Sequence, residues 1–382
     1  MNNDTVFMKE TISLAKKALG KTSPNPMVGA VLVKNGKIIG RGFHERYGDK
    51  HAEIHAIENA TKFVAGATLY CNLEPCCHES IEKHNSPCVQ RIIKVKIKKV
   101  LIASIDPNPH VSGKGIELLR KSGIKVEVGI CKKEAILLNE TYFKSIQKKE
   151  PFIHIKIAQS LDGRIATKAG DSKWITNGRA RLLVQRMRKL YDGILVGCNT
   201  VKTDNPRLTI RDSDTKQPFR IILDADLCIP ENTNVVSDWN KNRSIIVTSK
   251  KQCSEKIKRM KDKGIRVIEV SKEDDGLLNL NELMKKLFDL GINSILVEGG
   301  SRVFTQFISK MLFDKISVFI APIIIGEGIN AINDLNTLKI SDVLKLENPS
   351  IEIIEDNLLF SGYRDLKYIF GKLAKDLRCL QG

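Results

Sequence analysis

Three side chains that bind metals, His51, Cys76 and Cys88, stand out in this sequence, together with Glu53. One imidazole and two thiolates can hold zinc and leave its fourth coordination position to water. Zinc lowers the pKa of such a water to about 7, so that hydroxide forms at neutral pH. Glu53, one residue removed from His51, can then shuttle protons without binding the metal. The set therefore indicates the chemistry of a zinc-activated hydrolytic deaminase.

The spacing of the two cysteines departs from the usual zinc-deaminase signature. Cys76 and Cys88 are separated by 11 residues, whereas the signature has two. A structural zinc site is the alternative, and it needs a fourth protein ligand, for which Cys77, His78 and His84 are available. Glu53 would have no chemical role in such a site.

Composition limits the classes of protein to which the chain can belong. With 382 residues and a hydrophobic content of 42%, two domains with substantial cores are expected. No apolar run reaches the ~18 residues of a membrane span, and residues 1–20 lack the apolar stretch of a signal peptide. The nine cysteines are scattered, which favours free thiols in a reducing cytoplasm.

Positive charge is spread along the chain. The formal net charge is +18, with +9 on each side of residue 146. Basic and apolar residues alternate over 91–99, a pattern that predicts a strand with one solvated face. A surface that serves phosphorylated small substrates, or a bias in codon usage, explains the charge more simply than nucleic-acid binding, which stays an alternative.

Helices and strands alternate in the first part of the chain, which implies a sheet covered by helices. The pattern predicts helices at 9–19, 52–61 and 113–121, a hairpin at 29–42 with an Asn35-Gly36 turn, and strands at 67–71, 99–103 and 125–128. The strand at 67–71 should deliver Cys76 to a helix start, where a thiolate is favoured. A polar stretch at 145–151 marks the boundary between domains at 1–146 and 147–382.

The second part is rich in strands, which we expect at 152–158, 193–197, 219–223, 244–247, 266–270, 294–297 and 315–320. After the strand at 294–297, Gly299 and Gly300 precede a helix at 302–310, and such a turn lets a phosphate approach backbone N–H groups. The G-x-G-x-x-G fingerprint is absent, so a plain strand–helix turn is the alternative. A polar loop over 200–211 gathers Thr, Asp, Asn and Arg.

Several motifs occur in an order that is typical of one enzyme family. They are PNPMVGA (24–30), GFH (42–44), HAE (51–53), LEPC (73–76), DPNP (106–109), GKGI (113–116), SLDG (160–163), DSKWIT (171–176), TVKTDNPRLTIR (200–211) and VEGG (297–300). On these residues the chain resembles the bifunctional deaminase–reductase family of riboflavin biosynthesis, over nearly its whole length.

The resemblance implies an α/β fold class, with an N-terminal cytidine-deaminase-like α/β/α domain and a C-terminal dihydrofolate-reductase-like α/β domain. It implies hydrolytic removal of the 2-amino group of 2,5-diamino-6-ribosylamino-4(3H)-pyrimidinone 5′-phosphate, then reduction of the ribosyl group to ribityl. The implied cofactors are Zn²⁺ and NADPH. The implied partners are the phosphorylated pyrimidine and a second copy of the chain, in a cytoplasmic homo-oligomer formed through the reductase domain, without nucleic acid or membrane.

Functional residues carry over from the family by position. In the deaminase half, the resemblance makes His51, Cys76 and Cys88 the zinc ligands and Glu53 the proton shuttle. Substrate-pocket positions match Asn25, His44, Asp106 and Asn108. Turn and cap chemistry alone would also explain Asp106 and Asn108, because prolines follow both of them.

In the reductase half, cofactor-contacting positions match Ala158, Trp174, Thr200, Asp204 and Gly300. Substrate positions match Ser172, Arg188, Leu208, Arg211 and Glu298. Arg188 and Arg211 suit the substrate phosphate, since guanidinium groups bind phosphate oxygens in bidentate fashion. A solvated helix face is the alternative for Arg188. Asp204 could protonate or orient the sugar.

The segment between Cys76 and Cys88 departs from the family pattern, because it is longer and lacks the usual Gly and first Pro. Lys83 could take the place of a basic residue that contacts substrate there. Zinc binding should survive, since added loop length costs little free energy, but deaminase rate or specificity could change. A reductase with a weakened deaminase half is therefore a second hypothesis, and a nucleic-acid-binding deaminase a third.

Overall fold

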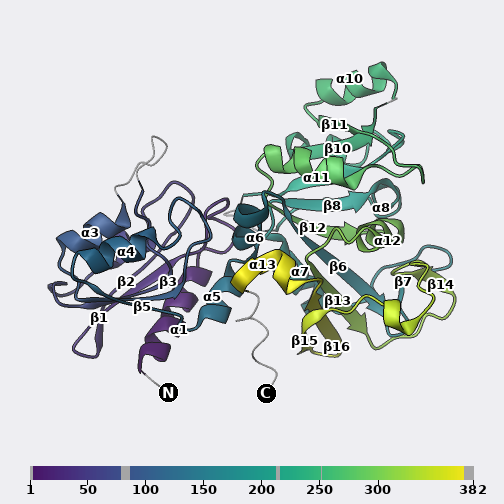
Figure 1. Cartoon of the computed structure of the whole chain (residues 1–382). Coiled ribbons are helices and arrows are strands. Elements are labelled where there is room, and N and C mark those ends of the chain that lie inside the picture. The colour runs from purple at the N-terminus through teal and green to yellow at the C-terminus, as the bar shows by residue number, and fades with distance from the viewer. Residues whose placement is uncertain (1–2, 79–86, 212–215, 251, 374–382) are drawn as a thin grey trace. The chain divides into compact units, whose positions relative to one another are not determined.

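The computed structural model describes residues 3–78, 87–211, 216–250 and 252–373 (Figure 1). The chain divides into two compact units between Lys149 and Glu150. The segment expected at this boundary is partly helical, because α6 (Glu140–Lys148) runs almost to the division. Among the described residues, no helix has both the length and the apolar character needed to cross a membrane.

Within the described residues, the first unit holds a five-stranded sheet in the order β2-β1-β3-β4-β5. Its strands are β1 (Gly29–Lys34), β2 (Lys37–Phe43), β3 (Thr68–Leu73), β4 (Lys99–Ser104) and β5 (Lys125–Val128). β1 pairs antiparallel with β2 and β3, whereas β3, β4 and β5 are parallel. The other helices are α1 (Asn3–Lys16), α2 (Ala52–Glu58), α3 (Cys88–Lys94), α4 (Lys114–Lys121) and α5 (Lys132–Leu138).

Helices cover both faces of this sheet, because its central strands are apolar on both sides. Leu69 and Cys71 of β3 pack with α2, α3 and α4, and Tyr70 between them packs with α1 and α5 on the opposite face, as the two-residue period of a strand requires. The predicted hairpin turn is confirmed, with positive φ at both Asn35 and Gly36, the conformation of a type I′ turn.

Two local expectations in the first unit are wrong. Residues 91–94 belong to α3 rather than to a strand, because Val89 and Ile92, three apart, are the buried positions of a helix face. Alternation over so few residues fits either period. Cys76 lies in the loop after β3, and Cys88 is the cysteine that begins a helix.

The second unit contains, within its described residues, a nine-stranded sheet in the order β11-β10-β9-β8-β12-β6-β13-β16-β15. Its strands are β6 (Phe152–Ser160), β8 (Gly193–Gly197), β9 (Phe219–Leu223), β10 (Ser244–Ser249), β11 (Arg266–Val270), β12 (Ser294–Gly299), β13 (Lys315–Ala321), β15 (Glu347–Ile354) and β16 (Asn357–Tyr363). All pairings are parallel except those of β16 with β13 and β15. A small separate sheet pairs β7 (Arg164–Thr167) with β14 (Gly328–Asn330).

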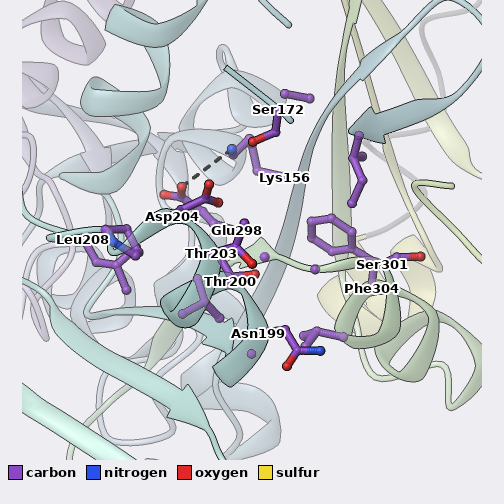
Figure 2. Close-up of a pocket in the computed structure, with 18 of the residues that line it drawn as sticks. Lys156, Ser172, Asn199, Thr200, Thr203, Asp204, Leu208, Glu298, Ser301 and Phe304 are labelled. Atoms are coloured by element: carbon purple, nitrogen blue, oxygen red, sulfur yellow. Dashed lines mark ion pairs between the residues drawn. The ribbon is translucent and has the colours of Figure 1, made fainter. Parts of the chain in front are cut away.

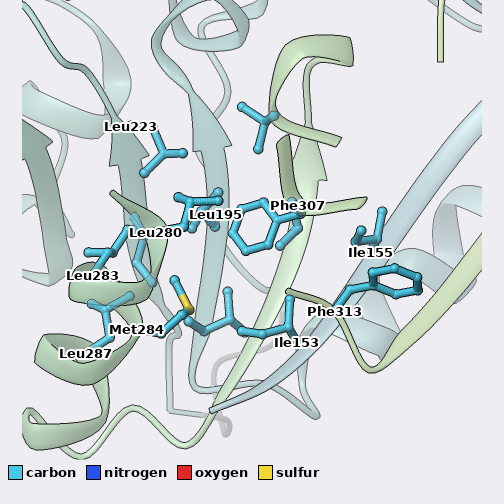
Figure 3. Packing of buried hydrophobic residues seen from close by; sticks show 14 of the residues in the cluster. Ile153, Ile155, Leu195, Leu223, Leu280, Leu283, Met284, Leu287, Phe307 and Phe313 are labelled. Atoms are coloured by element: carbon cyan, nitrogen blue, oxygen red, sulfur yellow. The ribbon is translucent and has the colours of Figure 1, made fainter. Parts of the chain in front are cut away.

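Helices cover the nine-stranded sheet as well. They are α7 (Gly178–Arg188), α8 (Cys198–Asp204), α9 (Asn234–Ser237), α10 (Ser254–Asp262), α11 (Leu280–Asp289), α12 (Ser301–Ser309) and α13 (Leu366–Phe370), with short 3₁₀ turns at Lys241–Arg243, Ile340–Asp342 and Gly371–Leu373. The α11 and α12 helices bury Leu283 and Phe307 against Ile155 and Leu195 of the strands (Figure 3). The α8, α9 and α10 helices contribute to a second cluster, which contains Ile194 and Val196. Because neighbours along β8 enter different clusters, the two helix groups cover opposite faces.

Gly42 offers a test of how tightly α2 is held. A Cβ atom at Gly42 would lie 2.3 Å from the Ala52 oxygen and 2.7 Å from the His55 Cβ atom. We expect Gly42→Ala to push α2 off β2, at a cost of about 1–3 kcal/mol for overpacking. Hydrogen–deuterium exchange should become faster across α2. Gly178→Ala is the control, since its Cβ would meet only the Arg181 side chain, at 3.8 Å; equal exchange in both variants would contradict this packing.

Candidate active sites

The three zinc-ligating side chains expected from the sequence lie together in the first unit. His51 immediately precedes α2, Cys76 follows β3, and Cys88 begins α3. The His51 Nδ1 atom lies 3.2 Å from the Cys88 Sγ atom and 3.3 Å from the Cys76 Sγ atom. The three ligand atoms all lie within 4.8 Å of one another, although their residues span 37 positions of the sequence.

These separations fit a tetrahedral zinc ion. Zn–N and Zn–S bonds of ~2.0 and ~2.3 Å imply N···S distances of about 3.5 Å. A hydrogen bond with Cys76, together with burial, raises the pKa of the Cys88 thiol, so a cation is needed to keep both sulfurs ionised at neutral pH. The donor set of one imidazole and two thiolates therefore suits zinc and leaves one position open.

Among the described residues, no fourth protein ligand joins this group. The candidates Cys77 and His78 are not members of it, and the Cys77 thiol faces the His110 carbonyl oxygen at 3.9 Å. His84 and Lys83, like the rest of 79–86, lie outside the described residues. The arrangement that the structure does describe is the open one expected of a catalytic site.

Glu53 is buried in the first turn of α2, where it is 3% exposed. Its Oε2 atom has no hydrogen-bond partner among the described residues. Burial raises the pKa of Glu53 above its ordinary value, which allows the carboxyl to hold a proton more readily. A buried, unsatisfied carboxyl oxygen costs free energy, so the fold alone does not explain its presence.

Asn25 and His44 border the zinc group. The His44 ring lies edge-on to the His51 ring, with centroids 5.5 Å apart, and burial lowers the pKa of His44. The His44 Nδ1 atom lies 3.1 Å from the Lys50 carbonyl oxygen. When that nitrogen donates to Lys50, the His44 Nε2 atom accepts from the Asn25 amide at 3.2 Å. These bonds hold an uncharged imidazole beside the metal ligands.

Asp106 and Asn108 stabilise a turn, which is one of the two roles that the sequence allowed for them. The Asp106 side chain accepts from the Asn108 backbone N–H at 2.8 Å and from the Tyr142 hydroxyl at 2.9 Å. Glu74 secures the same loop by accepting the backbone N–H groups of Gly113 and Ile116. Burial raises the pKa of Asp106 to about 6. A contact of Asp106 or Asn108 with substrate stays a prediction.

The second site is a crevice in the second unit. The α8 helix follows β8 on one face of the sheet, whereas α12 follows the neighbouring β12 on the other face. Such divergence opens a crevice at the carboxyl ends of the strands, where α/β proteins bind ligands. A pocket of about 1740 Å³ lies there. Figure 2 shows Thr200, Thr203 and Asp204 of α8 on one side, with Ser301 and Phe304 of α12 on the other.

All the residues that the sequence assigned to the reductase half line this pocket. They are Ala158, Ser172, Trp174, Arg188, Thr200, Asp204, Leu208, Arg211, Glu298 and Gly300. The expectation of a single loop over 200–211 is wrong in its first part, since residues up to Asp204 continue α8. The pocket gathers these side chains from segments that lie far apart in the sequence.

A buried ion-pair network forms one wall of the pocket. Arg188 donates to both Glu298 carboxylate oxygens, at 2.6 and 2.9 Å, and to the Thr209 carbonyl oxygen at 3.1 Å. Lys156 adds a second positive charge, 3.6 Å from Glu298. Burial raises the pKa of Glu298, but the charges of Arg188 and Lys156 outweigh burial and lower it to about 2. Arg188 is therefore paired with Glu298, with only 13% of its side chain exposed, rather than on a solvated helix face.

Lys156 is a pocket residue that sequence reasoning missed. It lies in β6, directly between the apolar residues Ile155 and Ile157. A lysine in an otherwise apolar, buried strand is costly unless its charge is paired. That signal in the sequence could have identified Lys156 as a partner of a buried acid.

The glycine turn after β12 brings the backbone close to α8. Gly300 has φ of 85°, which other residues rarely adopt, and its added Cβ would lie 3.3 Å from the Thr200 hydroxyl. A Cβ at Gly299 would come within 3.0 Å of the same hydroxyl. Glycine at both positions leaves open the space between α8 and the start of α12, which a bound molecule can occupy.

Comparison with known proteins matches both units. Residues 1–104 match the model of the cytidine and deoxycytidylate deaminase zinc-binding region, and residues 151–360 match the RibD C-terminal domain. The chain is 44% identical to the riboflavin biosynthesis protein RibD of Aquifex aeolicus, over 93% of this chain and 97% of that protein. It is 40% identical to RibD of Bacillus amyloliquefaciens, over 91% and 94%.

Solved structures agree over nearly the whole chain. A RibD structure from Acinetobacter baumannii has a TM-score of 0.84 at 31% identity, and a diaminohydroxyphosphoribosylaminopyrimidine deaminase/5-amino-6-(5-phosphoribosylamino)uracil reductase from Thermotoga maritima has 0.81 at 35%. Each comparison covers 95% of this chain and 99% of the other. The predicted fold class, a cytidine-deaminase-like unit followed by a dihydrofolate-reductase-like unit, is confirmed. Both units match the corresponding family models, and the similarity to RibD proteins covers more than 90% of the chain. This chain therefore belongs to the RibD family of riboflavin biosynthesis proteins.

Proposed function

We propose that the chain catalyses two consecutive steps of riboflavin biosynthesis, hydrolytic deamination and then reduction of one phosphorylated pyrimidine. The substrate is 2,5-diamino-6-ribosylamino-4(3H)-pyrimidinone 5′-phosphate. The observation that carries the proposal is the unpartnered, buried oxygen of Glu53 beside the His51, Cys76 and Cys88 group. A pocket large enough for a dinucleotide, in the same chain, supports the reductive step.

In the deamination step, zinc when bound supplies the Lewis acid that makes water nucleophilic at neutral pH. Glu53 accepts a proton from the attacking water and passes it to a ring nitrogen of the pyrimidine. Glu53 then transfers the hydroxyl proton to the 2-amino group, the C–N bond breaks, and ammonia leaves as the carbonyl forms. Asn25, which the uncharged His44 holds in place by a hydrogen bond, orients the ring by hydrogen bonding.

In the reduction step, NADPH when bound supplies the hydride. Hydride adds to C1′ of the ribosyl group, the bond from C1′ to the ring oxygen breaks, and that oxygen takes a proton. Asp204 orients the sugar, and the Lys173 ammonium, 3.7 Å from Asp204, supplies this proton. Glu298 accepts hydrogen bonds from the substrate while Arg188 and Lys156 keep the carboxylate ionised.

Arg211 suits the substrate phosphate better than Arg188 does. The Arg188 guanidinium already donates to Glu298 and to Thr209, in a buried position. Arg211 lines the pocket and is exposed, so it can present its planar donors to phosphate oxygens. We therefore assign the phosphate to Arg211 and an internal structural role to Arg188.

The remaining proposals concern the cofactor, the assembly and the compartment. NADPH is proposed as the nicotinamide cofactor, between Thr200 of α8 and the turn at Gly300. A homo-oligomer through the second unit is supported by Ile351 and Ile353 of the terminal strand β15, which are 71% and 72% exposed. None of the eight described cysteines forms a disulfide, which supports a cytoplasmic location.

Glu53→Gln tests the proton shuttle. Gln keeps the size of the side chain but cannot carry the proton, so ammonia release should fall by about 10²–10⁴-fold. Zinc content and NADPH oxidation with deaminated substrate should stay at the level of the unaltered chain. Glu58→Gln, on the exposed part of the same helix, is the control. Retained ammonia release in Glu53→Gln would reject the catalytic role and favour a structural zinc site.

Removal of zinc separates the two activities. A chelator should abolish ammonia release from the diamino substrate and leave reduction of the deaminated substrate unchanged, because the second unit has its own pocket. Both products should be measured on one sample with its zinc content. Weak ammonia release from the fully zinc-loaded chain would instead favour a reductase with a weakened deaminase half. Salt-sensitive RNA binding with a deaminated RNA product would favour a nucleic-acid-binding deaminase.

Glu298→Gln tests the ion-pair network. Loss of the carboxylate charge leaves Arg188 and Lys156 buried without a counter-ion, which should destabilise the second unit by about 3–5 kcal/mol and abolish reduction, with ammonia release unchanged. The folded-state pKa of Glu298 is lowered from 4.5 to about 2. The stabilisation of the fold by ionised Glu298 is therefore present above about pH 5 and is lost as pH falls towards 2.

The measurement is hydrogen exchange of the second unit between pH 7 and pH 3, corrected for the intrinsic rate. Glu298→Gln should show a flatter dependence of protection on pH than the unaltered chain. Glu352→Gln, at an exposed position of β15, should behave like the unaltered chain. Parallel pH profiles in all three proteins would show that the network does not stabilise the fold.

A further inference from the structure

A second group of metal-ligating side chains lies in the second unit, and neither proposed reaction uses it. Cys198, Asp224 and Cys228 place one ligand atom each within 4.8 Å of the others. Cys198 is the first residue of α8, Asp224 directly follows β9, and Cys228 comes four residues later. All three line the large pocket.

Strand pairing brings these residues together. Gly197, the last residue of β8, pairs with Leu223, the last residue of β9. Because the two strands are parallel, Cys198 and Asp224 emerge side by side at their carboxyl ends. The Asp224 carboxylate then accepts the backbone N–H groups of Cys228 and Ile229, at 2.9 and 3.0 Å, which fixes the turn that returns Cys228 to the group.

Two of the three ligand atoms are already within hydrogen-bonding distance of each other. The Cys228 thiol lies 3.1 Å from the Asp224 Oδ1 atom. Asp224 itself is fully buried, so its position does not depend on solvent. A carboxylate oxygen that is held by backbone N–H groups retains a lone pair for a cation. The site is therefore built before any metal binds.

Charge favours a divalent cation over a monovalent one. Lys202, one turn beyond Cys198 on α8, places its ammonium nitrogen 2.8 Å from the Cys228 Sγ atom. Two thiolates and one carboxylate carry −3, and Lys202 reduces this to −2, which a divalent ion neutralises. A bound divalent cation favours the thiolate form of both cysteines.

We propose that Cys198, Asp224 and Cys228 form a second metal site for a divalent ion that binds thiolates, and that this ion is zinc. Two sulfurs and one carboxylate oxygen supply three ligands, and water from the pocket takes the fourth position. This site is separate from the group at His51, because it belongs to the other unit and shares no ligand with it. The same two thiols could also be oxidised to a disulfide, which the experiment distinguishes.

The experiment measures zinc per chain on the full-length protein, equilibrated with a zinc buffer under reducing conditions. The unaltered chain should bind two zinc ions, and Cys198→Ser and Cys228→Ser should each bind one. Cys253→Ser is the matched control, since Cys253 is an exposed thiol of the same unit outside the group, and it should bind two. Hydrogen exchange of the second unit should be unchanged in all three variants, which shows that this unit folds in each of them.

Cobalt and thiol labelling provide independent readouts. With cobalt in place of zinc, the thiolate-to-metal absorption should correspond to four sulfurs in the unaltered chain and to two in the double variant Cys198→Ser/Cys228→Ser. Zinc should protect Cys228 from alkylation, as located by peptide mass spectrometry. One zinc ion in the unaltered chain, or two in Cys228→Ser, would overturn the proposal. So would a Cys198–Cys228 disulfide that persists in the zinc-loaded chain.

Discussion

The pairing of parallel strands is the constraint on which both sites depend. Leu73 of β3 pairs with Ser104 of β4, so the loop that carries Cys76 and the loop that carries Asp106 leave the sheet at the same edge. In the second unit, the pairing of β8 with β9 and β12 places the starts of α8 and α12 beside each other. Hydrogen bonding between strands thus determines which segments, distant in the sequence, can contribute side chains to one site.

Two largely buried glutamates show how the surroundings shift the pKa of one residue type in opposite directions. Glu53 has an oxygen without a partner, and burial raises its pKa. Glu298 lines the pocket with its side chain 7% exposed, but the charges of Arg188 and Lys156 keep its pKa low. The first carboxyl is suited to gaining and losing a proton, whereas the second is suited to holding a constant negative charge.

Close backbone approach explains where glycine is required. At Gly42 the strand contacts the backbone of α2, the helix that carries Glu53, and a side chain there would displace it. At Gly300 a positive φ turns the chain into α12 beside Thr200. In both units, therefore, a glycine sets the distance between a strand and the helix that bears functional side chains. Small residues at these contacts act through the position of the backbone rather than through chemistry of their own.

The sequence by itself determined the two-part α/β organisation, the hairpin at Asn35-Gly36, the zinc-ligand set with Glu53, and the family. These features follow from local periodicity, turn chemistry and ordered motifs, all of which are properties of contiguous residues. Tertiary structure alone decided that 91–94 are helical and that Arg188 pairs with Glu298, 110 residues away. It also decided that Lys156 forms an ion pair with Glu298, and that Cys198 lies beside Asp224 and Cys228. The physical reason is that strand order selects such partners, and no local pattern of residues encodes the order in which distant strands pair.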